Sequence, residues 1–340
     1  MIKKDFLDRN TQLKKVSLSV DSLFRENYSN TKSTDYTLHL PSSINNVLSM
    51  EVTAVEIPNF IYMFSSKKRE TEFTITVYNY KIRDGSNTET KTVNSTEYPI
   101  SIPEGNYVNI DFVNMINAYF LDRGGGLNYL IIEIDVNSGK TIFRARHPID
   151  DRNLASPFDP STPFYSPTFY FSLDFRIPNI ERPIYKNLGW ILGFKKEFYL
   201  VTPDKKLSTF FIPNSLDSIN NNEIIFFAYC KSEGTYGNTL DNYIFLDIDD
   251  DNKSYSTDEI MSYLPGKYVD GNILARIIIN STANSINFTS AADYITKKRE
   301  FYGPVNINAL KIKLLDKHGD LLELNGNDYS FLIEFTTIDY

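Results

Sequence analysis

The stretch PVNINALKIKLLD, Pro304 to Asp316, decides the fold because its apolar and polar residues alternate. A period of two is typical of a strand with one buried face. Val305, Ile307 and Ala309 occupy odd positions, whereas Leu310, Ile312 and Leu314 occupy even positions. Such a slip by one residue indicates a β-bulge. The stretch therefore predicts one long strand with a bulge near Ala309–Leu310.

Similar alternation recurs along most of the chain. Turn signals at His318-Gly319 and Asn325-Gly326 follow this strand, and the alternation resumes in DYSFLIEFTTI, residues 328–338. Further strands are predicted from Asp35 onward, in YIFLDI (243–248) and in ILARIIIN (273–280). The segment IIEIDVNSGKTIFRA, residues 131–145, predicts a hairpin that closes at Asn137-Ser138-Gly139.

A second, weaker helix is predicted from about Thr257 to Pro265, and the clearer one lies within GNYVNIDFVNMINAYFLDRGGG, residues 105–126. Gly124 is its stop signal, and its apolar face consists of Val108, Phe112, Val113, Ile116, Tyr119 and Phe120. Residues 147–222 carry many prolines, which do not fit central strands, so this region is predicted as an insertion of long loops. Many strands beside one short helix indicate an all-β antiparallel sandwich or barrel.

Composition restricts the classes of function. The 340 residues can bury a sizeable core. The net charge of −8 disfavours a nucleic-acid partner, because an acidic chain repels the phosphate backbone. The 24 phenylalanines and 23 tyrosines favour strands and large contact surfaces. The single cysteine suits a reducing cytoplasm. No apolar run approaches the roughly 18 residues of a membrane span.

None of the catalytic motifs considered fits the sequence. His39, His147 and His318 lie far apart in the sequence, without a second His or Cys at the spacing of zinc ligands. Cys230 ends the apolar run IIFFAYC, which predicts a small buried residue rather than a nucleophile. The tripeptide GKT at 139–141 belongs to the predicted hairpin turn. We therefore expect that the protein is not an enzyme and binds no cofactor.

The acidic turn DIDDDNKSYSTDE, residues 247–259, is the one metal candidate. Asp247, Asp249 and Asp251 occupy alternate positions, as the ligands of a calcium loop do. However, Asn252 stands where such a loop needs glycine, and Asp258 stands where it needs a bidentate glutamate. The pattern therefore favours a solvated acidic turn without a metal ion.

The segment NLGWILGFKKEFY, Asn187 to Tyr199, holds the only tryptophan of the chain. Gly189 and Gly193 would let two backbone segments approach closely at its ends. One helical turn would place Trp190 beside Phe194, since residues four apart share a helix face. We expect Trp190 to be a buried anchor where the proline-rich region enters the sandwich.

Residues 1–34 are predicted as an N-terminal arm, and residues 35–340 as one domain with the proline-rich insertion at about 147–222. The alternating Val16, Leu18 and Val20 are too few to fold alone, because ordering each backbone residue costs about 1–2 kcal/mol. With Phe24, they are expected to remain mobile in the isolated protein and to contact a neighbouring subunit during assembly. The lysines of the arm favour an acidic partner or anionic lipid.

Several segments keep one order along the chain: VDSLFRENYSN (20–30) with residues 33–65, IPEGNYVNIDFVNMIN (102–117), LGWILGF (188–194), NILARIIIN (272–280) and residues 301–335. Together they resemble capsid structural proteins of nucleocytoplasmic large DNA viruses. The resemblance extends from about Val20 to Phe335 and is weakest between His147 and Pro183. It implies a jelly-roll protein of the icosahedral shell, either a penton or a minor capsid protein. It implies no catalytic residues.

The partners implied by the resemblance are other capsid proteins, in a homopentamer or a minor-capsid network, with inner-membrane contact through the arm. The implied location is the virion, after assembly in the host cytoplasm. Two alternatives stay open. One is a carbohydrate-binding or carbohydrate-processing β-sandwich on the virion surface, which needs an exposed aromatic platform beside Asp or Asn. The other is a membrane-associated capsid scaffold that uses the basic residues of the arm.

Overall fold

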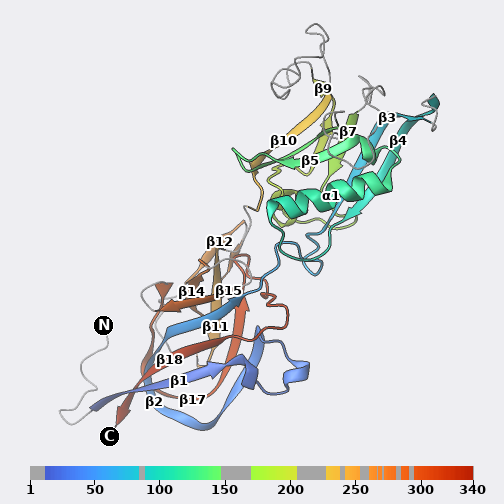
Figure 1. Cartoon of the computed structure of the whole chain (residues 1–340). Coiled ribbons are helices and arrows are strands. Elements are labelled where there is room, and N and C mark those ends of the chain that lie inside the picture. Colours follow the sequence, from blue (N-terminus) through green and yellow to red (C-terminus); the bar gives the residue numbers. More distant parts are fainter. Residues whose placement is uncertain are drawn as a thin grey trace. The chain divides into compact units, whose positions relative to one another are not determined.

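The structure is a computed structural model that describes residues 12–83, 89–146, 170–204, 227–237, 242–252, 260–265, 267–269, 272–280, 285–290 and 295–339. Within these residues, all strand pairs are antiparallel, which confirms the predicted all-β antiparallel class. The chain packs as two units, shown in Figure 1. Unit 1 comprises Met1–Tyr62 and Asp241–Tyr340, and unit 2 comprises Met63–Leu240.

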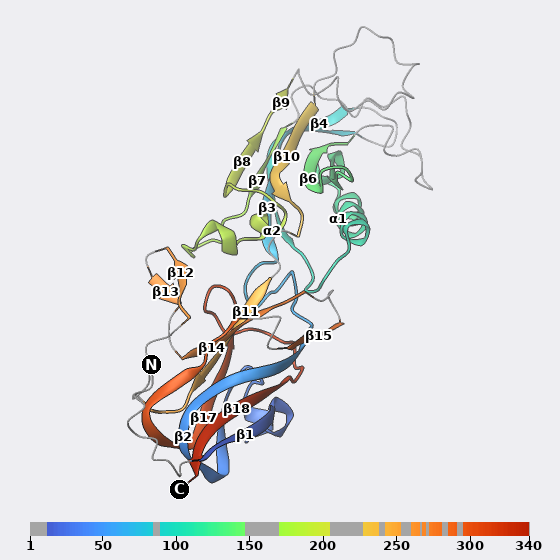
Figure 2. The same cartoon turned by 90° about the vertical axis from the view of Figure 1, so that its left-hand side faces the viewer.

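Unit 1 is built on one curled antiparallel sheet. Its elements are β1 (Gln12–Asp21), η2 (Ser22–Phe24), η3 (Tyr28–Asn30), β2 (Asp35–Asn59), β11 (Tyr243–Asp249), β12 (Ser262–Leu264), β13 (Lys267–Val269), β14 (Ile273–Ile278), β15 (Ser285–Ser290), β16 (Ile295–Thr296), β17 (Arg299–Leu315) and β18 (Ser330–Asp339). The eight-stranded sheet has the order β1-β18-β2-β17-β11-β14-β16, and β15 pairs with β2. Figure 2 shows how strongly β2 and β17 bend, and this curl fits the jelly-roll class that the resemblance implied.

Strand β17 contains the predicted bulge. Ile307 pairs with Ile44 of β2 and Ala309 pairs with His39, so the register shifts between these two residues of β17. The inward-facing side changes at the same place, because Ile307 and Leu310 are both fully buried although they lie three residues apart. The phase slip in the sequence therefore marked a real irregularity of the strand.

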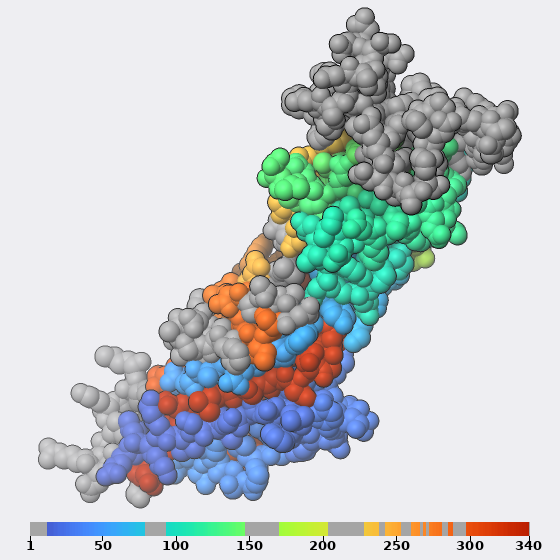
Figure 3. All heavy atoms as spheres, viewed as in Figure 1, coloured from blue at the N-terminus to red at the C-terminus, as the bar shows by residue number. Residues whose placement is uncertain are grey.

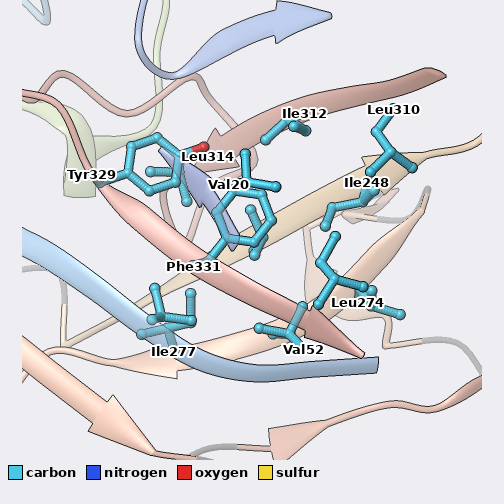
Figure 4. Close-up of a cluster of buried hydrophobic side chains, with 14 of the residues drawn as sticks. Val20, Val52, Ile248, Leu274, Ile277, Leu310, Ile312, Leu314, Tyr329 and Phe331 are labelled. Carbon is cyan, nitrogen blue, oxygen red and sulfur yellow. The ribbon is translucent and has the colours of Figure 1, made fainter. Parts of the chain in front are cut away.

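The core of unit 1 forms where the inward faces of these strands meet (Figure 4). Its buried side chains come from segments far apart in the sequence, including Val20, Val52, Ile248, Leu274, Ile277, Leu310, Ile312, Leu314, Tyr329 and Phe331. Burying one such aliphatic or aromatic side chain contributes about 1.5–3 kcal/mol. Val20 and Phe331, which lie more than 300 residues apart in the sequence, therefore share one core.

Unit 2 contains two four-stranded sheets with an apolar core. Its elements are β3 (Glu72–Arg83), β4 (Glu89–Ser101), α1 (Asn109–Arg123), η4 (Leu127–Tyr129), β5 (Leu130–Ile134), β6 (Lys140–Ala145), β7 (Tyr170–Asp174), η6 (Ile184–Lys186), α2 (Leu188–Ile191), β8 (Phe198–Val201), β9 (Pro203–Asp204) and β10 (Phe227–Thr235). One sheet has the order β4-β3-β7-β8 and the other β5-β6-β10-β9. The predicted hairpin over 131–145 is confirmed as the pair of β5 and β6.

Helix α1 matches the predicted helix within 105–126. Phe112, Ile116 and Phe120 are buried, and Gly124 ends the helix with a positive φ of 60°. Val108 and Tyr119, expected on the same face, are exposed, because Val108 only caps the helix and Tyr119 lies at the border of the stripe. The helix also covers the edge of β5, since the Asn117 amide donates to the carbonyl of Ile132 and accepts from its N–H, both at 2.9 Å.

Two expectations differ from this packing. Strands expected in one sandwich divide between the units: β3 and β4 join β7 of unit 2, whereas β2 pairs with β17 and β18 of unit 1. In addition, part of the proline-rich insertion forms strands β7 and β8 instead of loops, while residues 147–169 and 205–222 lie outside the described residues. Alternation of apolar and polar residues identifies a strand, but contacts between distant residues determine which strand it pairs with.

Candidate contact site

The N-terminal segment is part of unit 1 from Gln12 onward, which corrects the expectation of a separate mobile arm. Strand β1 pairs with β18 along all ten of its residues without a register shift. Val20 is only 3% exposed, and Val16 and Leu18 pack against the same core. The alternating residues therefore gain the apolar contacts that they lack alone. Residues 1–11 lie outside the described part of the chain.

The residues after β1 are fixed by one carboxylate just before β18. Arg25 Nη1 lies 2.5 Å from Asp328 Oδ1, the Ser22 hydroxyl donates to the same oxygen at 2.8 Å, and the Tyr28 hydroxyl donates to Oδ2 at 2.9 Å. The Arg25 side chain is only 7% exposed. Charge-assisted hydrogen bonds are stronger than neutral ones, so this network holds the segment in one conformation.

This fixed segment presents apolar side chains to solvent. Leu23, Phe24 and Tyr28 are all exposed, and Phe24 is 78% exposed. We call these three residues the N-terminal contact surface. Large apolar residues gathered on a fixed frame are typical of interaction sites. Of the residues expected in assembly contacts, Phe24 is thus accessible, whereas Val20 belongs to the chain's own core.

A second exposed patch lies on the hairpin of β12 and β13. Tyr263 stands directly opposite Tyr268, their ring centroids are 6.1 Å apart, and the rings meet at 70°. Both tyrosines and Met261 are exposed, whereas Val269 on the other face is buried. We call these three residues the tyrosine hairpin. The weak helix predicted up to Pro265 is wrong here, because Ser262–Leu264 forms strand β12. Two tyrosines flanking Pro265-Gly266 are a visible hairpin signal.

The segment around Trp190 has a different arrangement from the one expected. Trp190 is half-buried, with Lys195 Nζ 3.3 Å from the centre of its ring, while Phe194 is fully buried and stacks on Phe175 at 5.3 Å. Helix α2 ends at Ile191, and the positive φ of Gly193 redirects the chain. The two rings therefore do not share one helix face, and Phe194 is the residue anchored in the core of unit 2.

Both glycines of this segment lie against other parts of unit 2. A Cβ on Gly189 would lie 2.5 Å from the Phe175 ring, and one on Gly193 would lie 2.4 Å from the carbonyl oxygen of Gly234. The next turn is held by the Tyr199 hydroxyl, which accepts from the backbone N–H groups of Lys195 and Lys196, each at 2.9 Å. Burial, followed by its hydrogen bond to Glu233, raises the pKa of Tyr199 above its ordinary value.

The three aspartates of the acidic turn are each used in local contacts. Asp247 accepts from the N–H of Asn272 at 3.0 Å, Asp249 accepts from the N–H of Asp251, and Asp251 pairs with Lys311 at 2.6 Å. Burial raises the pKa of Asp247. No three ligand side chains of the described residues are grouped to hold a metal ion. Asp258, the twelfth position of the motif, lies outside these residues.

The remaining reactive side chains are scattered. Burial raises the pKa of Cys230 to about 12, which keeps it a thiol. His39 lies 3.0 Å from Glu26 on an exposed surface of unit 1, His318 occupies the turn after β17, and His147 lies outside the described residues. Over the part of the chain that the structure describes, none of the helices is long and apolar enough to cross a membrane.

Comparison with known proteins finds similarity to solved structures, including two viral ones. No protein-family model and no curated protein matches the chain. The crystal structure of the mavirus penton protein is 10% identical with a TM-score of 0.43, over 95% of this chain and 99% of that one. A chain of the Sputnik virophage, solved by cryo-EM at 3.5 Å resolution, is 13% identical with the same TM-score, over 95% and 98% of the two chains. At this TM-score, neither similarity bears on the function.

Proposed function

We propose that this protein is a structural component of an icosahedral viral capsid, either a penton or a minor capsid protein, and that it functions through subunit contacts. The observation that carries the proposal is the N-terminal contact surface. Phe24 is 78% exposed, yet its segment is held by the hydrogen bonds and ion pair of Asp328. A preorganised apolar residue loses little conformational entropy when a partner covers it.

One further observation supports the proposal. The sequence blocks that resemble capsid proteins of large DNA viruses include residues 20–30 and 301–335, which supply Phe24 and Asp328.

The carbohydrate-binding alternative has one observation in its favour, the exposed tyrosine hairpin. A flat sugar-binding platform, however, needs rings that lie in nearly the same plane. Tyr263 and Tyr268 meet at 70°, so only one of them could stack on a given sugar face. Tyrosine is also enriched at the centres of protein interfaces, and this geometry therefore fits a protein contact better.

The proposal is tested by fractionating purified virions. Detergent removes membrane and the proteins that only membrane retains, while the capsid shell stays intact and is sedimented. We expect the full chain to remain in the shell fraction and to dissociate only when the shell itself is disrupted. Release with the lipid would instead support the membrane-associated scaffold, and absence of the chain from virions would overturn the proposed function.

A further inference from the structure

Among the described residues, strand β1 leaves one long, regular edge of the unit 1 sheet open, because it pairs only with β18. In Figure 3, the dark blue surface of the N-terminal residues lies beside the red surface of the C-terminal residues. The N–H of Ser22 donates to the carbonyl of Tyr329, and the register has no shift. Backbone groups of even-numbered residues therefore face β18, because hydrogen-bonded pairs alternate in an antiparallel ladder. Those of Leu13, Lys15, Ser17, Ser19 and Asp21 face outward.

This edge lacks most of the features that prevent strand addition. Native edge strands are usually short, bulged, interrupted by proline or charged along their length. Strand β1 has ten residues and an unbroken register, and its sequence QLKKVSLSVD contains no proline. Its two lysines lie together in its first half, so the second half of its open edge carries no lysine. Such an edge can accept another antiparallel strand.

One antiparallel register of β1 against itself is complementary in both charge and apolarity. It places Leu18 opposite Leu18 of a second copy and Val16 opposite Val20. On the outer face, Lys15 then stands opposite Asp21, and opposite charges across a strand pair are stabilising. The exposed Leu13 comes to lie next to the turn that carries the exposed Leu23. Sliding the second copy by two residues would instead put Lys14 opposite Val20 and Leu13 opposite Asp21.

We propose that the open edge of β1 pairs antiparallel with the same edge of a second copy of this chain, across a twofold axis at Leu18. The outward-facing backbone groups of Lys15 and Ser17 exchange hydrogen bonds with those of Asp21 and Ser19 in the second copy. The Lys15 ammonium, which lies 2.5 Å from Glu334 of its own sheet, gains the Asp21 carboxylate as a second partner. The two curled sheets thereby become continuous.

This inference deepens the proposed function and rests on it for its place in a shell. An isologous contact joins subunits across a twofold axis, whereas a ring of five requires heterologous contacts. Pairing through β1 therefore favours a minor-capsid position, or a contact between capsomers, over a contact within a pentamer.

Cysteine cross-linking of the purified full-length chain tests the axis. Leu18 would oppose itself in a non-hydrogen-bonded pair, where the Cα atoms lie about 4.5 Å apart, a distance that a disulfide can span. We expect Leu18→Cys to form a covalent dimer under mild oxidation. The matched control is Val16→Cys, on the same face, whose two copies would lie about 13 Å apart along the strands and should not cross-link. Dimers from both variants, or from neither, would overturn the register.

A charge exchange tests the contact independently, with native mass spectrometry as the readout. Lys15→Asp places two acidic residues opposite each other at each end of the paired strands, and Asp21→Lys places two basic ones there. Each variant alone should be at least tenfold weaker in dimerisation than the wild type. Mixed together, they restore opposite charges at both ends and should form a one-to-one heterodimer of near wild-type strength.

Two results would overturn the inference. In the first, the mixture of the two charge variants stays monomeric while the wild type dimerises. In the second, the wild type stays monomeric and Leu18→Cys does not cross-link. The fractionation of virions is a separate measurement. A chain that is retained in the shell but monomeric in both tests leaves the proposed function standing and refutes only the β1 contact. A chain that dimerises through β1 but is absent from virions would support the β1 contact and refute the proposed function.

Discussion

Replacing Gly193 with alanine is expected to destabilise unit 2 by roughly 2–5 kcal/mol, from two additive causes. The backbone at Gly193 has a φ of 90°, and left-handed backbone costs an L-residue about 1–2 kcal/mol. The new Cβ would also lie 2.4 Å from the carbonyl oxygen of Gly234. Forcing such an overpacked contact apart typically costs about 1–3 kcal/mol.

Two other glycines of unit 2 separate these causes. Gly124 has a positive φ but nothing within 4 Å of its would-be Cβ, so alanine there introduces backbone strain alone. Gly189 has no positive φ, but its Cβ would lie 2.5 Å from the Phe175 ring, so alanine there introduces steric overlap alone. Each single cause is expected to cost about 1–3 kcal/mol.

The assay is the labelling rate of Cys230 in a urea series on the full-length chain. This is the only cysteine and it packs against the core of unit 2, so its exposure reports the opening of that unit and not of unit 1. The midpoint should fall furthest for Gly193→Ala. If Gly193→Ala were no worse than Gly124→Ala, the close approach of the Trp190 segment to β10 would be wrong.

Two more results are expected from buried or partly buried groups. The pKa of Cys230 is raised to about 12 in the folded chain and is about 8.5 in an unfolded one, so its contribution to stability is complete below about pH 8.5 and is lost as pH rises toward 12. Labelling of the native chain at pH 8 should therefore be roughly a thousandfold slower than labelling in urea. A native rate near that of free cysteine would contradict the burial of Cys230. Asp328→Ala should lower the stability of unit 1 by about 3–5 kcal/mol, because it leaves the Arg25 guanidinium buried without its carboxylate. The control Phe24→Ser, at an exposed side chain, should change this stability by about 0.5 kcal/mol or less. Calorimetry of both variants measures the two effects, and equal effects would refute the role of Asp328.

Much of the fold could be predicted because alternation is a local signal. The phase slip at Ala309–Leu310 located the irregularity in β17, and the apolar stripe with Gly124 located helix α1. In both cases the information lies within a few residues of the feature. The same holds for the hairpin of β5 and β6, whose turn residues stand between two apolar runs.

The features that sequence reasoning missed depend on contacts between distant residues. Nothing near Val16 indicates that β18, more than 300 residues away, offers it an edge. Ser22 and Arg25 likewise reveal their role only beside Asp328. For Trp190, the expected i,i+4 geometry required a helix that continues, but α2 ends at Ile191. Local patterns thus identified elements, whereas the candidate contact site arose from their pairing.

The copy number of the chain in purified virions tests most directly whether it is a capsid component. Quantitative mass spectrometry against a labelled standard of the full chain gives copies per particle, with a known capsid protein as the internal reference. The proposed function predicts a fixed number in every preparation, either about sixty, for five copies at each of twelve vertices, or a whole multiple of that number. A chain that is absent, or whose amount varies between preparations relative to the reference, would contradict it.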